Sequence, residues 1–257
     1  AFKMFTSGSF CDPNELSLEY QTKILQALIE YESVKEIVVE SRPEYITEEV
    51  LQTYRKILDQ RKENDTSEAK HLEFAVGLES SSEFLRKNVI NKGFSWENFV
   101  SAVERIHKHG FGVKVYLLFK PPFVKEYAAI CDLKKSLRDC LDLGVETISI
   151  NPTNVQNHTI CSQLERFNMF RPPWCYSLLR VLKSTLTADD LKKTRVVSDP
   201  SGAGKSRGIH NCQPRDRSTN FCLKVLNKFV LSQDLNDIPK DLTKDGCWEE
   251  YLYEILL

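Results

Sequence analysis

Short apolar runs alternate with amphipathic stretches of helical length through the first 150 residues. The apolar runs lie at residues 2–5, 36–39, 72–78, 113–119 and 146–150. Between them, side chains that suit a buried face recur three and four residues apart, as in an amphipathic helix; two such sets are Leu18, Gln21, Leu25, Leu28 and Ile29, and Val50, Leu51, Tyr54, Ile57 and Leu58. This repetition of strand and helix predicts a parallel sheet with helices packed against it.

Capping residues give the expected ends of these helices. Asp12, followed by Pro13 and Glu15, predicts that the first helix starts at Asp12. Glycines at 110 and 144 end the helices expected over 95–109 and 130–143, and a short helix is expected before the first of these. Residues 61–70, RKENDTSEAK, are expected to form a solvated loop.

The regular alternation of strand and helix patterns stops after about residue 170. The sequence RPPW at 171–174 predicts the start of an extra helix, because proline suits the first helical turn. A strand is expected at 194–197 and two further helices at 218–232 and 246–257. We therefore expect an α/β fold: an incomplete (β/α) barrel over 1–170 and an α-rich C-terminal extension over 171–257 that binds substrate.

Composition excludes several classes of protein. Of the 257 residues, 41% are hydrophobic and 28% are charged, which is ordinary for a soluble globular protein. The net charge of −1 gives no overall attraction to nucleic acid, so any such surface must be local. No membrane span or signal peptide is seen, and a cytoplasmic location is expected. The eight cysteines lack paired spacing, which predicts free thiols in a reducing compartment.

Polar side chains follow each apolar run of the expected barrel. They lie at 6–9, 40–42, 79–81, 120 and 151–154. In a (β/α) barrel the carboxyl ends of the strands meet around one site, so chemistry is expected there. Ser80 and its neighbours suit helix caps, whereas Glu40, Glu79 and Lys120 are charges directly after apolar strands and need a partner or a ligand.

The stretch SDPSGAGKSRG at 198–208 resembles a nucleotide phosphate loop but lacks two features that such a loop needs. Asp199 stands where that loop needs its first glycine, and no helical pattern follows Lys205. Its glycines suit unusual backbone angles or a close approach to a ligand. With Lys205, Arg207 and His210, the loop is predicted to be a basic substrate-approach loop for RNA phosphate, with a solvated surface turn as the alternative.

At the strand ends the sequence resembles the radical S-adenosylmethionine (SAM) superfamily, and within it the radical SAM proteins that partner archaeosine synthase in tRNA modification. The resemblance is carried, in order, by FTSGSFCDPNE, VVESRPEYI, VGLESSSEFLRKNVINKGF, VYLLFKPPF, SINPTNVQ and SDPSGAGKSRGIHNC. It implies SAM as cofactor, tRNA as substrate and an archaeosine synthase subunit as partner, with no membrane. The residues that it assigns to SAM are Ser7, Gly8, Ser9, Glu40, Arg42, Glu79, Ser80, Arg86, Lys120 and Asn151, and those that it assigns to substrate are Asn154, Lys205, Arg207 and His210.

Within these sets, the resemblance implies that Ser7, Gly8 and Ser9 meet the SAM amino group. Glu79 would face the ribose, and the forked guanidinium of Arg86 would suit the SAM carboxylate. A surface position on its helix is the alternative for Arg86. Lys120 and Asn151 would border adenine and substrate.

The cysteine motif that holds the superfamily's [4Fe–4S] cluster is not found. No three cysteines have the spacing C-x-x-x-C-x-x-C. We expect a missing N-terminal cluster segment, with a degenerate homologue as the alternative. After Cys212 the next cysteine is Cys222, so Cys212 is expected to be a buried or free thiol and is only a weak metal candidate.

The complete enzyme is thus expected to cleave a lysine-adducted 7-deazaguanine nucleoside in tRNA to the amidine of archaeosine, as a lyase-type reaction. Two alternatives remain open. One is a radical SAM enzyme with another RNA substrate, of the methylthiotransferase or Elongator kind. The other is a cluster-free subunit that binds RNA or a partner.

Overall fold

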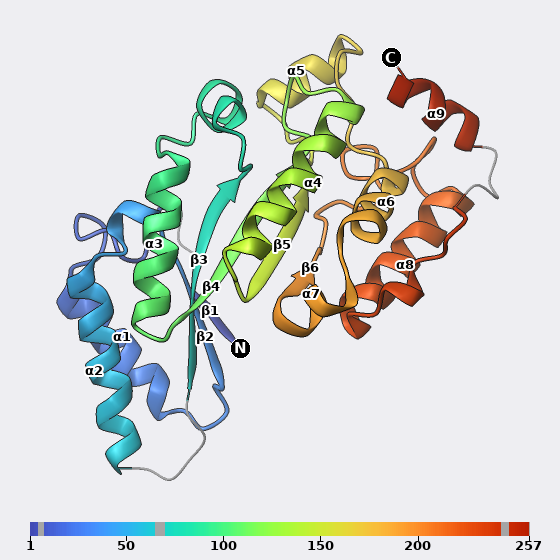
Figure 1. Ribbon diagram of the computed structural model, residues 1–257. Helices are drawn as coiled ribbons and strands as arrows, with labels where there is room; N and C mark the ends of the chain where they lie inside the picture. Colours follow the sequence, from blue (N-terminus) through green and yellow to red (C-terminus); the bar gives the residue numbers. More distant parts are fainter. Residues whose placement is uncertain (5–7, 65–69, 243–246, 257) are drawn as a thin grey trace. The chain divides into compact units, whose positions relative to one another are not determined.

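Six strands follow one another along a single sheet. The computed structural model describes residues 1–4, 8–64, 70–242 and 247–256. The strand order is β1-β2-β3-β4-β5-β6 (Figure 1), with bounds β1 Phe2–Met4, β2 Glu36–Glu40, β3 His71–Glu79, β4 Gly112–Phe119, β5 Thr147–Pro152 and β6 Arg195–Val197. In the first and last pairs the strands are parallel, with Met4 opposite Val39 and Ser149 opposite Val197. This sequential order is that of a (β/α) barrel and not of a doubly wound sheet, so the expected fold class is confirmed.

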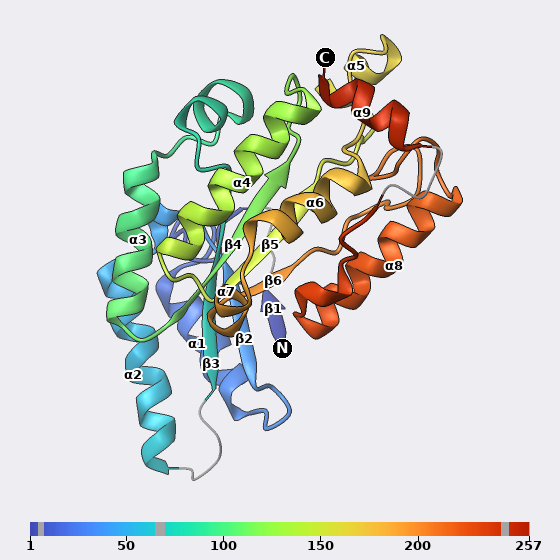
Figure 2. The ribbon, with the colours of Figure 1, turned by 45° about the vertical axis from the view of Figure 1, so that its right-hand side comes forward.

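The chain divides into two compact units, and β4 contributes to both. The first contains residues 1–78 and 94–115, and the second contains residues 79–93 and 116–257. The boundary expected at residue 170 lies within the second unit and stays a prediction. After that residue, α6 and α9 pack against α4 within the second unit, and α6 also contacts α8 (Figure 2).

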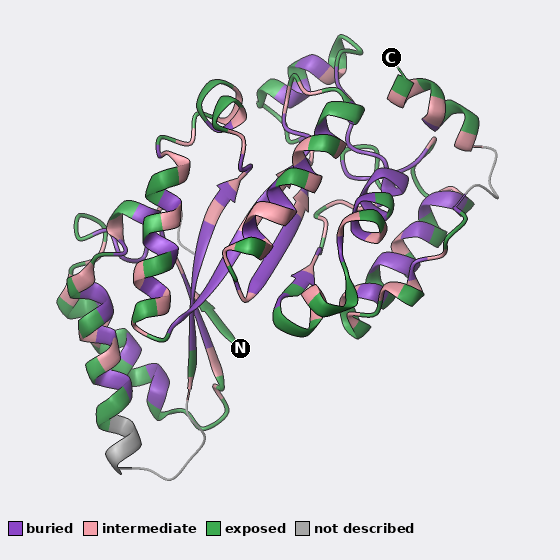
Figure 3. Cartoon of the chain, in the orientation of Figure 1, coloured by how far each residue is buried: buried purple, intermediate pink, exposed green. Residues whose placement is uncertain are grey.

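The first unit carries the helices α1 Leu18–Glu30, α2 Glu48–Asn64 and α3 Trp96–Lys108, with a short 3₁₀ turn at Pro43–Tyr45. Its strands β2 and β3 are largely buried (Figure 3). The ring of Phe74 on β3 stacks on Tyr54 of α2 at 6.0 Å. The buried hydroxyl of Tyr54 donates to Gln21 Oε1 of α1 at 2.8 Å, so the one polar group on the predicted inner face of α1 is satisfied.

Two expectations about this unit were wrong. Helix α1 begins at Leu18, with Ser17 as its N-cap, and not at Asp12. The Asp12 carboxylate instead accepts from the backbone N–H of Asn14 at 2.9 Å, and the turn that it stabilises precedes the helix. Helix α2 continues to Asn64, because Arg61, Lys62 and Glu63 favour helix and extend it into the stretch expected to be a loop; residues 65–69 lie outside the described residues.

The second unit carries most of the helices. Their bounds are η2 Leu85–Ile90, α4 Glu126–Asp142, α5 Ile160–Arg166, α6 Cys175–Thr185, α7 Ala188–Lys193, α8 Arg217–Ser232, η3 Leu235–Asp237 and α9 Trp248–Leu256. The strand at β6 and helices α6, α8 and α9 confirm the elements expected after residue 170. Helices α5 and α7 were not expected, although the capping box formed by Thr187 and Asp190 marks the start of α7. Within the described ranges, no helix has the length and apolar character needed to cross a membrane.

Candidate functional site

In the first unit, the loops after β1 and β2 meet. The backbone N–H of Phe10 donates to Glu40 O at 2.9 Å, and the N–H of Arg42 donates to Ser9 Oγ at 3.1 Å. Two loops that the sequence assigned to SAM are therefore in direct contact; Ser7 itself lies outside the described residues. The Arg42 side chain turns to Glu44 at 2.6 Å and lies over the Phe94 ring.

Gly8 lies directly against the carboxylate of Glu15. A Cβ at residue 8 would lie 1.8 Å from Glu15 Oε1, so the Glu15 side chain would have to move aside. The same carboxylate accepts from the Ser9 N–H through Oε2 at 3.2 Å. Glu15 was predicted only as part of a helix start, but it supplies the negative charge beside the predicted SAM loop.

The end of β3 carries Glu79 in a left-handed backbone conformation, with φ of 69°. Such a conformation is uncommon for residues other than glycine and marks sites that the surrounding structure holds in place. Its carboxylate pairs with Lys92 Nζ at 2.9 Å, and both side chains remain partly exposed. Ser80 is buried, donates to Asp132 Oδ1 at 2.6 Å and accepts from the Ser82 N–H, so it stabilises the turn after β3 and does not cap η2.

Arg86 is a buried residue and not a surface one. Its side chain is 1% exposed and its Nη1 donates to Ser80 O at 2.8 Å, while its Nη2 pairs with Glu83. The guanidinium thus fixes the loop after β3 onto η2. Its predicted contact with the SAM carboxylate stays a prediction, and the arrangement seen here gives Arg86 a positioning role.

Lys120, directly after β4, is the most enclosed of the three charges predicted at strand ends, Glu40, Glu79 and Lys120. It also has a left-handed backbone, with φ of 61°, and its side chain is 4% exposed. Its Nζ lies 2.7 Å from Oε2 of the fully buried Glu126 and 3.4 Å from Glu254 Oε1. Glu126 begins α4, and its Oε1 accepts from the Trp174 backbone N–H at 3.0 Å. The partner that the sequence demanded for Lys120 therefore comes from the next helix.

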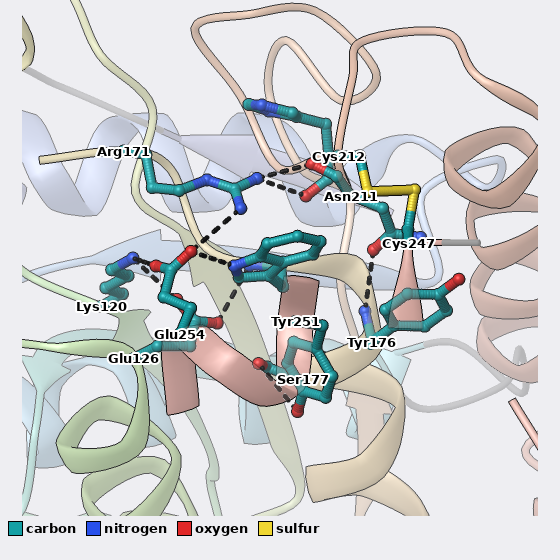
Figure 4. Close-up of polar contacts among 12 residues, drawn as sticks. Lys120, Glu126, Arg171, Tyr176, Ser177, Asn211, Cys212, Cys247, Tyr251 and Glu254 are labelled. Carbon is teal, nitrogen blue, oxygen red and sulfur yellow. Dashed lines mark hydrogen bonds and ion pairs between the residues drawn. A yellow bond between two sulfur atoms is a disulfide. The ribbon is translucent and has the colours of Figure 1, made fainter. Parts of the chain in front are cut away.

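Glu254 of α9 receives three donors from two other parts of the second unit, the end of β4 and the segment before α6 (Figure 4). Besides Lys120, Arg171 Nη1 lies 3.2 Å and Trp174 Nε1 lies 2.7 Å from Glu254 Oε2. Burial alone would raise the pKa of the Glu254 carboxyl, but Lys120 and Arg171 outweigh it and hold that pKa below its usual range. The carboxylate is therefore ionised at neutral pH.

A cavity of about 620 Å³ opens beside this cluster. Its walls combine the charged groups with apolar side chains, namely Lys120, Phe123, Val124, Lys125, Glu126, Leu164, Asn168, Met169, Phe170, Arg171 and Glu254. Pockets of this size and mixed lining hold small molecules or parts of larger substrates. All of these residues belong to the second unit.

The loop at 198–208 is closed by its own hydrogen bonds. The N–H groups of Gly204 and Lys205 donate to Ile209 O and Gly202 O, and that of Gly208 donates to Lys205 O. Amides committed in this way cannot cradle a phosphate, and the next helix, α8, begins only at Arg217. The exclusion of a nucleotide phosphate loop is consistent with this geometry.

The loop is joined to the end of β5. The Val155 N–H donates to Arg207 O at 2.7 Å, and Asn154 Nδ2 donates to Ser201 Oγ at 3.2 Å. The buried Asn154 Oδ1 receives no hydrogen bond from the described residues. Asn151 is half-buried on β5, while the side chains of Lys205 and Arg207 are exposed. Their substrate roles stay predictions.

His210 does not supply the positive charge expected of it. It is 7% exposed, its Nδ1 lies 2.7 Å from Gly208 O, and burial lowers its pKa below the usual value. The ring is therefore neutral at neutral pH, and only Lys205 and Arg207 make the loop basic.

The expectation for Cys212 was wrong. Its sulfur is bonded to that of Cys247, which precedes α9, in a disulfide (Figure 4), while the other six cysteines are free thiols. The two cysteines are 35 residues apart in sequence, and packing of α9 against α6, where Trp248 and Tyr251 contact Tyr176, brings them together, which no local spacing could show.

The residues present do not fit a [4Fe–4S] cluster. Across the part of the chain that the structure describes, no three His, Cys, Asp or Glu side chains gather to hold a metal. Such a cluster needs thiolate ligands, and the two cysteines that meet are already bonded. The residues predicted for SAM fall in both units: Gly8, Ser9, Glu40 and Arg42 in the first, and Glu79, Ser80, Arg86, Lys120 and Asn151 in the second.

Sequence reasoning missed four residues of the Lys120 cluster. Glu126, Arg171, Trp174 and Glu254 come from three separated parts of the chain. Glu126 gave one usable indication, since a glutamate at the start of a helix after a strand-end lysine suggests a pair. Glu254 gave none, because an acidic residue on a terminal amphipathic helix is ordinarily solvated.

No protein-family model matches the chain. Archaeosine synthase subunit beta of Methanosarcina acetivorans is 37% identical over 255 residues, covering 99% of this chain and 68% of that protein. The protein of the same name from Thermococcus kodakarensis is 37% identical over 254 residues, covering 98% of this chain and 73% of that protein. Across the curated relatives that it matches, the chain spans 65% to 73% of their length.

Among solved structures, the archaeal Elp3 of Methanocaldococcus infernus, with residues 1–46 deleted, has a similar fold. The TM-score is 0.58 at 18% identity, covering 87% of this chain and 53% of that one. At this identity the likeness supports the fold alone. The sequence relationships, which extend over nearly the whole chain, show that it belongs to the archaeosine synthase subunit beta family.

Proposed function

We propose that this chain is the SAM- and substrate-binding part of a radical SAM enzyme in archaeosine biosynthesis. The enzyme cleaves a carbon–nitrogen bond in a lysine-adducted 7-deazaguanine nucleoside of tRNA and leaves an amidine. The observation that carries this proposal is the 37% identity to two archaeosine synthase beta subunits over nearly the whole chain. Their name also implies a partner subunit.

The described residues support particular roles in this reaction. The Glu15 carboxylate beside Gly8 suits the ammonium group of SAM, because its oxygens can accept the ammonium N–H groups at a point of close backbone approach. Glu79, partly exposed at the end of β3, suits the ribose hydroxyls of SAM as an acceptor. SAM supplies the 5′-deoxyadenosyl group, and no step is derived through the cluster, whose ligands this chain does not show.

Recognition of tRNA is assigned to the loop at 198–208. Lys205 and Arg207 expose their charges on a loop that its internal hydrogen bonds make compact. A fixed loop presents cations to phosphate with little loss of conformational entropy. The cavity beside Lys120 is assigned to the modified base.

Complementation tests the proposal. The full-length gene is introduced into a Thermococcus kodakarensis strain lacking its own archaeosine synthase subunit beta, and tRNA nucleosides are measured by mass spectrometry. We expect the lysine adduct to disappear and archaeosine to return with the wild-type gene. Glu79→Ala should restore much less archaeosine, whereas Lys193→Ala, at an exposed site on α7, should behave as wild type.

Other results would contradict the proposal in distinct ways. If the adduct persists while the protein is expressed and binds tRNA, the chain is a binding subunit. If a methylthiolated or Elongator-type nucleoside appears instead, the substrate is a different RNA base.

A further inference from the structure

The carboxylate of Glu254 occupies a site built by other parts of the second unit. We propose that Lys120, Arg171 and Trp174 form a binding site for the carboxylate of a ligand, and that Glu254 is a built-in occupant that such a ligand replaces. The three donors come from the end of β4 and from the segment that leads into α6. Their donor atoms all lie within 3.4 Å of the Glu254 carboxylate oxygens.

The donors are held in place independently of Glu254. Arg171 Nη2 donates to the backbone oxygens of His210 at 3.2 Å and Asn211 at 2.6 Å, and its guanidinium lies 3.9 Å from the Trp174 ring centroid. Glu126 holds Lys120 at 2.7 Å. A site whose donors are already fixed binds an anion without having to reorganise.

The balance of charge makes the site require an anion. Lys120 and Arg171 carry two positive charges, and Glu126 and Glu254 carry two negative ones. If Glu254 leaves, one positive charge remains unbalanced next to a side chain that is 4% exposed. An unpaired charge at a buried position is energetically costly. Replacement of the Glu254 carboxylate by the carboxylate of a ligand keeps the cations paired and avoids this cost.

Helix α9 is anchored at its start by buried side chains and at Glu254 by polar contacts. Tyr251 is fully buried against Trp174 and Tyr176, and Cys247 is bonded to Cys212. Beyond Tyr251, in contrast, no described residue of α9 is buried, and Leu256 is 84% exposed. Glu254 is itself 32% exposed, so its displacement breaks polar contacts but uncovers no hydrophobic core.

The adjoining cavity indicates what the carboxylate is attached to. Beside the charged groups, its 620 Å³ are lined by the apolar side chains of Phe170, Met169 and Leu164. An apolar or aromatic body bearing a carboxylate fits these walls, as in an acylated amino acid. Identification of that carboxylate with the amino-acid arm of the modified nucleoside rests on the proposed function; the site itself does not.

Calorimetric titration of the full-length protein with hippurate, an aromatic carboxylate, tests the proposal. Hippuramide is the matched neutral probe. We expect Glu254→Ala and Glu254→Gln to bind hippurate about tenfold or more tightly than wild type, because the competing carboxylate is gone. Glu250→Ala removes the same charge from an exposed position on α9 and should leave affinity unchanged.

The proposal is overturned if neither Glu254 variant gains affinity for hippurate, or if Glu250→Ala gains as much. An equal gain for hippuramide would also overturn it, since the cavity and not the cation site would then bind the probe. If Glu254→Ala fails to fold, Glu254→Gln decides, because it keeps the shape of the side chain. The titration needs neither SAM nor tRNA, so restored archaeosine with no gain for hippurate rejects this inference and leaves the proposed function intact.

Discussion

The charged residues at the ends of β3 and β4 are stabilised in two different ways. Each has a left-handed conformation directly where an apolar strand stops, Glu79 in one case and Lys120 in the other. Glu79 meets a single partner, Lys92, and their side chains are 19% and 24% exposed. Lys120 is 4% exposed and lies against the fully buried Glu126.

The difference shows that burial, and not the presence of a charge, decides what a strand-end residue contributes. Water screens the Glu79 pair, which leaves its carboxylate available to a ligand. The Lys120 pair is desolvated, so each partner depends on the other. The same sequence pattern therefore gives an accessible acceptor at one strand end and a structural ion pair with an attached anion site at the other.

Removal of Lys120 should have the largest effect. Lys120→Ala leaves Glu126 buried without its cation, and we expect a loss of about 3–5 kcal/mol in the free energy of unfolding, measured by denaturant titration. The double variant Lys120→Met, Glu126→Gln removes both charges and keeps an acceptor for the Trp174 N–H. This double variant should recover most of the lost stability. A loss below about 1 kcal/mol in Lys120→Ala would contradict the prediction, because the Lys120 pair would then be screened by water like the Glu79 pair.

Loss of the disulfide should have the second-largest effect on stability. The disulfide fixes the start of α9, the helix that brings Glu254 to Lys120. Cys247→Ser opens a loop of 35 residues, for which the chain-entropy relation gives roughly 3–4 kcal/mol of stability. Cys131→Ser, at an exposed free thiol, is the control and should be neutral. Equal unfolding midpoints for the two variants would mean that packing of Tyr251 alone fixes α9.

Replacement of Glu79 should affect SAM binding more than stability, the opposite of what is expected for Lys120. Glu79→Ala is expected to change stability by about 1 kcal/mol or less, because its pair is partly exposed. In the full-length enzyme it should weaken SAM binding by roughly 1.5–3 kcal/mol, the usual value for a hydrogen bond to a charged group. Isothermal titration with SAM gives the affinity; an unchanged affinity would make Glu79 a structural residue like Lys120.

The smallest effects are expected at the exposed loop, whose charges are fully screened. Lys205→Ala and Arg207→Ala should each reduce the slope of log affinity for tRNA against log salt by roughly 0.7 to 0.9. Lys193→Ala on α7 serves as the control. Slopes that match wild type in both loop variants would make 198–208 a solvated turn.

Much of the fold followed from the sequence alone. Strand positions depend on local runs of apolar residues, so β2 to β6 lie where the pattern predicted them. The end of α3 follows from Gly110, whose φ of 67° suits a residue without a side chain. The start of α1 did not follow, because Asp12 caps a turn as readily as a helix, and only the packing of the following residues selects between the two.

The sequence also determined that charges stand at the ends of apolar strands, because that is a property of neighbouring residues. What each charge meets was decided only by the tertiary structure. Glu254 reaches Lys120 across 134 residues and Arg171 across 83, and Cys212 reaches Cys247 across 35. Side-chain periodicity carries information over one or two turns of helix, whereas pairing across such distances depends on how α6, α8 and α9 pack, which is set by the summed burial of many weakly specific apolar side chains.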